Sequence, residues 1–98
     1  MFIVRDIFHL KFGHYKDAKA LFDEAKSKNM FPEAQQLRML TDFTGDSYRL
    51  ILEQGHDSLA AYEKNLSEGM GQGDWKQWYE NFKSHVIRSH REILKQVM

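Results

Sequence analysis

The chain has 98 residues, of which 42% are hydrophobic and 29% are charged, proportions that are ordinary for a globular protein and argue against disorder. Its 14 basic residues balance its 14 acidic residues, so no net charge attracts it to nucleic acid or to an anionic membrane, and we expect neither as a partner. The absence of cysteine excludes disulfides and thiolate metal sites. We expect a single domain over residues 1–98.

The hydropathy pattern contains neither an export signal nor a membrane span. Charge appears at Arg5 and Asp6, directly after a short apolar start, which is unlike a signal peptide. No apolar run is long enough to cross a bilayer. Together with the lack of cysteine, these features make the cytoplasm the expected compartment.

The first half of the chain predicts a strand, a helix and a β-hairpin. Residues 2–12 are rich in β-branched and aromatic side chains and predict a strand. Apolar residues at helical spacing predict a helix over residues 15–28. Alternating hydropathy predicts strands over 35–43 and 48–53, joined by a tight turn at 44–46 that contains a glycine.

The second half predicts two helices. Gly55 is expected to end the third strand, and Ser58 or the preceding aspartate can cap a helix after it. Glycines at positions 69, 71 and 73 are expected to end that helix. Asp74, with Gln77 three residues later, resembles a capping box in front of an aromatic helix that begins at Trp75.

The tail fits two structures. Its apolar residues, from Val86 onward, can continue the aromatic helix, whereas residues 91–98 can form a strand, and periodicity does not decide between them. With a strand, the order of elements is that of the ferredoxin-like split βαβ fold, in which the last strand pairs beside the first. The predicted class is therefore α+β, with a four-stranded antiparallel sheet and helices on one face.

The side chains of the predicted strands alternate between two faces. One face is apolar and should lie under the helices; it consists of Phe2, Val4, Phe8, Leu10, Leu37, Met39, Phe43, Tyr48, Leu50 and Leu52. Asp6 falls in this row without a predicted partner. The other face mixes apolar and charged residues: Ile3, Arg5, Ile7, His9, Gln36, Arg38, Leu40, Asp42, Arg49, Ile51 and Glu53. Since the helices cannot cover both faces, we expect a second copy on the mixed face, in a two-fold homodimer.

The mixed face is also the predicted ligand site. A pair of sheets would enclose a space with apolar walls and a few polar groups, as small-molecule sites have. The candidate ligand-binding residues are Arg5, Arg38 and Arg49, whose planar forks suit carboxylate or phosphate oxygens. His9 is the candidate catalytic residue, as a base or as a group that orients the ligand. The predicted guest is a small anionic or oxygen-rich molecule.

A simpler interpretation of the same charges carries equal weight. The three arginines can form cross-strand ion pairs with Asp42 and Glu53, with no ligand involved. His14 and His56 fall at junctions between elements, where we expect exposed side chains. No histidine spacing forms a metal motif, so we expect no metal and no cofactor. No catalytic constellation is present, which leaves open whether the protein is an enzyme.

Three segments resemble the NIPSNAP-like group of the dimeric α+β barrel superfamily, which also contains the antibiotic-biosynthesis-type monooxygenases. They are Val4–Gly13 leading into a helix, the aromatic Trp75–Tyr79, and the tail Arg91–Val97, which is similar to the closing strand of those proteins. The resemblance implies a ferredoxin-like homodimer with a cavity between its sheets. Two functions stay open: a ligand-binding protein or cofactor-independent, monooxygenase-like enzyme, and a non-enzymatic dimeric interaction module.

Overall fold

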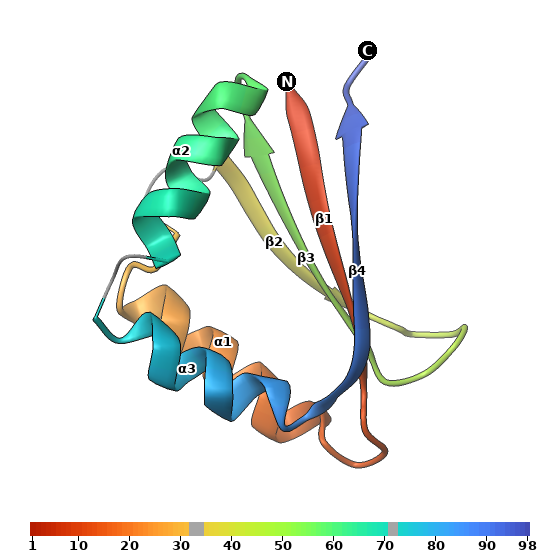
Figure 1. Ribbon diagram of the computed structural model, residues 1–98. Coiled ribbons are helices and arrows are strands. Elements are labelled where there is room, and N and C mark those ends of the chain that lie inside the picture. Colours follow the sequence, from red (N-terminus) through yellow and green to blue (C-terminus); the bar gives the residue numbers. More distant parts are fainter. Residues whose placement is uncertain (32–34, 71–72) are drawn as a thin grey trace.

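The computed structural model of the chain describes residues 1–31, 35–70 and 73–98. Its elements in chain order are β1 (Phe2–Leu10), α1 (Tyr15–Ser27), β2 (Gln35–Thr41), β3 (Arg49–His56), α2 (Leu59–Met70), α3 (Trp75–Lys83) and β4 (Val86–Lys95). The strands form one antiparallel sheet in the order β2-β3-β1-β4, and all three helices lie on the same side of it (Figure 1). This architecture confirms the predicted ferredoxin-like α+β fold.

The tail is a strand and does not continue the aromatic helix. The last turn of α3 closes where Ser84 Oγ donates to the Asn81 carbonyl at 2.8 Å and the His85 amide donates to the Phe82 carbonyl at 3.0 Å. The chain then pairs along the whole of β1, with a register shift beside His9. Pairing with β1 gives the tail a cross-strand partner that periodicity alone does not reveal.

Gly55 does not end the third strand, which continues to His56. A Cβ at Gly55 would lie 2.8 Å from Met1 Sδ and 3.2 Å from the Gln35 carbonyl oxygen, so the missing side chain lets β3 pass close to both neighbouring strands. The longer strand carries His56 into the interior, where only 2% of it is exposed. The expectation that His56 is exposed is therefore wrong.

Phe12 and Phe43 were both expected in strands, and both lie outside them and are exposed. β2 ends at Thr41, and Phe43 in the following loop is fully exposed. β1 ends at Leu10, and Phe12 is exposed in the turn that leads to α1. The assignment of Phe43 to the apolar face is wrong because β2 ends at Thr41, two residues before Phe43.

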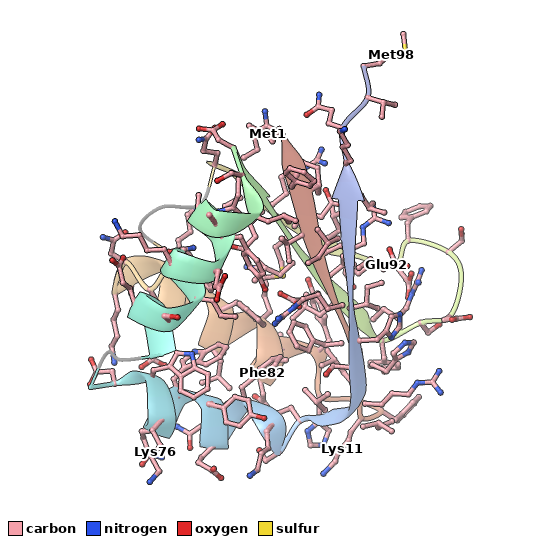
Figure 2. The ribbon with its side chains drawn as sticks, turned by 45° about the horizontal axis from the view of Figure 1, so that its top comes forward. Met1, Lys11, Lys76, Phe82, Glu92 and Met98 are labelled. Carbon is pink, nitrogen blue, oxygen red and sulfur yellow. The ribbon has the colours of Figure 1, made fainter. Side chains whose placement is uncertain are left out.

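The core lies between the sheet and the helices. Its buried residues are Leu10, Ala18, Phe22, Leu50, Leu52 and Phe82. Phe82 projects from α3 toward the sheet (Figure 2), and Trp78 Nε1 donates to the Leu21 carbonyl at 2.6 Å, which joins α3 to α1. Ser58 caps α2, since its Oγ accepts from the Ala61 amide at 3.0 Å. Asp74 makes no capping hydrogen bond, so the predicted capping box is wrong; Gly71, expected to end α2, lies outside the described residues.

Candidate functional site

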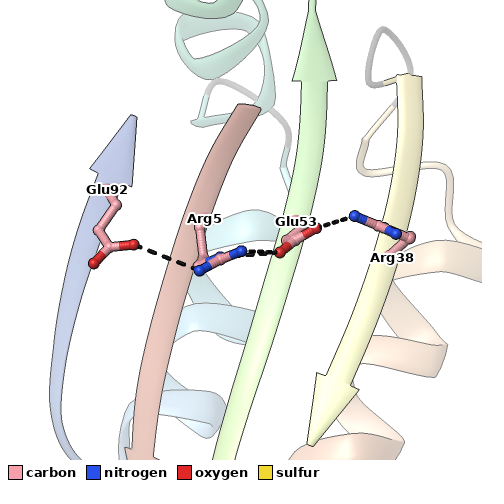
Figure 3. A network of polar contacts seen from close by, with 4 residues as sticks. All are labelled: Arg5, Arg38, Glu53 and Glu92. Carbon is pink, nitrogen blue, oxygen red and sulfur yellow. Dashed lines mark hydrogen bonds and ion pairs between the residues drawn. The ribbon is translucent and has the colours of Figure 1, made fainter. Parts of the chain in front are cut away.

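The face of the sheet away from the helices carries a row of alternating charges. The register of the strands aligns Arg38, Glu53, Arg5 and Glu92 across the sheet, with the helices behind it (Figure 3). Glu53 Oε2 lies 2.7 Å from Arg5 Nη2, and Glu53 Oε1 lies 2.5 Å from Arg38 Nη2. Arg5 Nη1 lies 3.7 Å from Glu92 Oε2. Burial alone would raise the pKa of Glu53, but the hydrogen bonds from Arg5 and Arg38 outweigh it and hold this pKa below its usual value.

A second row crosses the same face at the other end of the strands. Arg49 donates to Asp42 from Nε at 3.1 Å and from Nη2 at 2.8 Å, and these bonds lower the pKa of Asp42. His9 pairs with Arg49 on one side and with Arg88 on the other. The ring of His9 stacks on the ring of His90, with centroids 5.6 Å apart.

The four predicted site residues therefore share one face, as their strand phases indicated. Each of the three arginines, Arg5, Arg38 and Arg49, is bonded to a carboxylate, which is the ion-pair arrangement that the sequence allowed as an alternative. His9 lies between two arginines on neighbouring strands. A ligand-binding role for these four residues stays a prediction.

A cavity of about 590 Å³ lies on the opposite side, between the sheet and the three helices. Its volume falls within the range of small-molecule sites. Aromatic side chains form much of its wall: Phe8, Phe22, Phe31, Trp75, Trp78 and Phe82. Leu66 and Tyr79 also line it and are partly exposed, so the cavity reaches the surface between α2 and α3. Such walls suit a flat, largely apolar molecule.

One end of the cavity is polar. Asp6 projects from the middle of β1 and is only 8% exposed, and Arg91 on β4 reaches it with Nε 2.5 Å from Oδ1. The hydrogen bond and charge of Asp6 outweigh the effect of burial and raise the pKa of Arg91. The Arg91 guanidinium also lies over the ring of Tyr62, 5.8 Å from its centroid. Asp6, for which the sequence predicted no partner, thus forms an ion pair with Arg91, whose side chain is partly exposed.

Tyr62 and Asn65 carry the unsatisfied polar atoms of this end. They are three residues apart on α2 and therefore share one face of the helix. Tyr62 Oη and Asn65 Oδ1 are buried, and neither has a hydrogen-bond partner within residues 1–31, 35–70 and 73–98. Burial raises the pKa of Tyr62, while the charge of Arg91 and its polar contact with the hydroxyl oppose this rise. That contact does not have the geometry of a hydrogen bond, and the hydroxyl keeps its proton at neutral pH. The cavity thus presents a free donor beside a free acceptor.

His56 and Gln54 complete the polar end. Burial lowers the pKa of His56, so the imidazole is neutral at neutral pH. Its Nε2 lies 3.1 Å from Gln54 Oε1, and its ring lies 5.1 Å from the ring of Tyr62. His56 supports Tyr62 by packing against its ring and has its own hydrogen bond.

The sequence interpretation missed Tyr62, Asn65 and Arg91. The helical spacing of Tyr62 with Leu59 and Leu66 predicts an apolar face, and the polar Asn65 beside that face was the available signal. Arg91 could not be placed because the tail was undecided. In the part of the chain that the structure describes, no group of three histidine, aspartate or glutamate residues is arranged to hold a metal ion. No helix in the described ranges is long and apolar enough to span a membrane.

The fold and the cavity define the class: a ferredoxin-like α+β protein with a ligand-sized space between its helices and its sheet. Similar solved structures include a NIPSNAP domain protein from Burkholderia xenovorans, with a TM-score of 0.89, 10% identity and coverage of 99% of this chain and 95% of that one. A NIPSNAP family protein from Agrobacterium tumefaciens has a TM-score of 0.85 and 18% identity, covering 97% and 92% of the two chains. An antibiotic biosynthesis monooxygenase has a TM-score of 0.75 and 13% identity, with both chains fully covered.

These structures confirm the predicted resemblance at the level of the fold. At such low identities the likeness extends to the fold alone and assigns no activity to this chain. No protein-family model matches the sequence. No curated protein matches it either.

Proposed function

We propose that this protein binds a flat, hydroxylated aromatic molecule in the cavity between its helices and its sheet. The observation that carries the proposal is the pair of orphaned atoms, Tyr62 Oη and Asn65 Oδ1, in an aromatic cavity. A buried polar atom without a partner costs roughly 1–3 kcal/mol, and a ligand that supplies the missing hydrogen bond removes that cost. A ligand hydroxyl can donate to Asn65 Oδ1 and accept from the Tyr62 hydroxyl. The aromatic walls supply the apolar contact.

A fluorescence titration with 2-naphthol tests this proposal, with naphthalene as the ligand that lacks the hydroxyl. We expect 2-naphthol to change the emission of Trp75 and Trp78, which line the cavity, and to bind more tightly than naphthalene. Tyr62→Phe should weaken 2-naphthol binding about fivefold, since one hydrogen bond is worth about 1 kcal/mol. Tyr48→Phe, the same change outside the cavity, should leave binding unchanged. Equal affinity for the two probes, or an unchanged Tyr62→Phe variant, would contradict the proposal.

The enzymatic form of the proposal is oxygenation of the bound molecule by O₂ without a cofactor. It draws on the structural neighbour described as an antibiotic biosynthesis monooxygenase. In such a reaction a ligand CH₂ group and O₂ give a carbonyl group and water, so the ligand supplies all the electrons. Oxygen uptake with a tricyclic aromatic ketone that carries a CH₂ group tests this step. Binding without protein-dependent oxygen uptake would leave a binding protein and reject the oxygenase.

The open face of the sheet supports a second proposal, the homodimer. A two-fold axis through the middle of the charged row would set Arg5 opposite Glu53 of the second copy and Arg38 opposite Glu92 of the second copy. The same axis would set Ile7 opposite Ile51 of the second copy and Leu40 opposite His90 of the second copy. Charges of opposite sign and apolar side chains would thus meet across the interface.

Sedimentation at micromolar concentration tests the homodimer and should give twice the chain mass. Leu40→Asp should dissociate the pair, because Leu40 is partly exposed on the open face and would place an unpaired charge in the interface. Thr41→Asp, the neighbouring position on the other face, should leave the pair intact. A wild-type monomer at this concentration would contradict the proposal. A dimer that binds no aromatic probe would favour the plain interaction module.

The predicted compartment and the absence of nucleic-acid and membrane partners remain proposals as well. The balanced charge and the cysteine-free composition support them. Cell fractionation of the expressed full chain tests the compartment, and recovery in a membrane or exported fraction would contradict it.

A further inference from the structure

The row at the far end of the open face contains more positive than negative groups. Arg49, His9 and Arg88 lie side by side on β3, β1 and β4, and His90 lies two residues from Arg88 on β4. The rings of His9 and His90 are 5.6 Å apart, with an angle of 27° between their planes. Two imidazoles and a guanidinium therefore gather on two adjacent strands.

Of the two carboxylates that act on this row, Asp42 and Asp46, Asp42 is already engaged. Both carboxylate oxygens of Asp42 accept hydrogen bonds from Arg49, at 2.8 to 3.1 Å. Arg88 forms no ion pair with any residue of the described ranges. No hydrogen bond joins the ring of His9 or His90 to another side chain within those ranges. The donors of His9, His90 and Arg88 are thus free.

The pKa of His9 reflects the excess of positive groups in this row. Burial and the positive charges of Arg88, His90 and Arg49 lower the pKa of His9, and the carboxylate of Asp46 opposes them only in part. A bound anion would counteract the positive charges around His9 and raise its pKa. Binding of an anion at this place would therefore be accompanied by proton uptake.

We propose that His9, His90 and Arg88 form a binding site for a small oxyanion. Arg88 offers a planar fork to two oxygens, and each imidazole can donate one N–H. The chemistry fits the phosphoryl group of a phosphate ester or the carboxylates of a small organic acid. Arg88 and His90 also contribute to the lining of the aromatic cavity at the edge strand β4, whereas His9 does not. The oxyanion proposal rests on His9, His90 and Arg88, and not on the Tyr62 and Asn65 atoms that carry the proposed function.

The site differs from the one that the sequence predicted on this face. The sequence named Arg5, Arg38 and Arg49, and all three are bonded to carboxylates. The proposed site combines His9 with Arg88 and His90, which lie beside it because β4 pairs with β1 along the whole of β1.

Titrations followed by NMR test the site on the full chain at constant ionic strength, with inorganic phosphate and malonate as separate probes and chloride as the control. We expect saturable shifts of the His9 and His90 ring resonances with phosphate or malonate, a rise in the pKa of His9 on binding, and weaker binding as pH rises. The tighter of the two probes identifies phosphoryl or carboxylate chemistry. Shifts that do not saturate, or that chloride reproduces, would overturn the proposal.

Variants with matched charge separate a defined site from a general attraction of anions. Arg88→Gln should weaken binding about tenfold, the size expected for a lost charge-assisted hydrogen bond. Lys95→Gln removes the same charge from the far end of β4 and should bind as the wild type does. Arg88→Lys, which keeps the charge without the fork, should bind less tightly than wild type and guards against a folding defect in Arg88→Gln. Equal losses of anion affinity in Arg88→Gln and Lys95→Gln would mean that anions are attracted by overall charge, and would reject the proposed site.

Discussion

The carboxylate of Asp6 and the guanidinium of Arg91 meet at 2.5 Å although 85 residues separate them in the sequence. Asp6 lies in the middle of β1 on the face that the helices cover, where a carboxylate is costly without a partner. Arg91 comes from the strand whose existence the sequence left undecided. This pair joins the two ends of the chain beneath α2 and forms the polar end of the aromatic cavity.

Removing Arg91 should therefore destabilise the fold through Asp6. We expect Arg91→Met to lower the free energy of unfolding by about 1–3 kcal/mol in urea denaturation, since it leaves a buried carboxylate unpaired. Adding Asp6→Asn should recover part of that loss, because the amide is neutral. A double variant no more stable than Arg91→Met would show that the two groups are not coupled.

Tyr62→Phe should cost no stability, in contrast to most changes at buried positions. The hydroxyl that it removes has no hydrogen-bond partner in the described residues, so no bond is lost. We expect the free energy of unfolding to stay level or to rise by up to about 1 kcal/mol. Phe22→Ala, at a buried ring in the same cavity wall, should cost about 3–5 kcal/mol. A loss above about 1 kcal/mol for Tyr62→Phe would mean that the hydroxyl has a structural partner.

The charged row of the open face should make stability depend on pH in the acid range. Arg5 and Arg38 hold the pKa of Glu53 below its usual value of 4.5 in the folded chain. Below pH 4.5 the unfolded chain takes up a proton before the folded chain does, so the stability that Glu53 contributes at neutral pH is lost as pH falls through its folded pKa. Urea denaturation between pH 7 and pH 3 should therefore show a shallower acid decline for Glu53→Gln than for wild type. Parallel declines would contradict this role for Glu53.

The sequence predicted the order of elements and both faces of β1 to β3, because each strand alternates and α1 has a clear apolar stripe. It did not predict the tail, since the apolar residues after Val86 fit a helix and a strand equally well, and only pairing with β1 decides between them. The same ambiguity concealed Arg91, at the polar end of the cavity, and Arg88 and His90, in the proposed oxyanion site. Tyr62 and Asn65 were concealed for another reason: whether a polar atom lacks a partner depends on packing, which no local pattern contains.

The most direct test of the aromatic cavity is a map of backbone and indole chemical-shift changes when 2-naphthol is added to the isotope-labelled protein. If the molecule binds between the helices and the sheet, the largest changes should fall on Tyr62, Asn65 and the indole groups of Trp75 and Trp78. Changes confined to the open face, around Leu40, Ile51 and Leu94, or the absence of saturable changes, would contradict the proposed function.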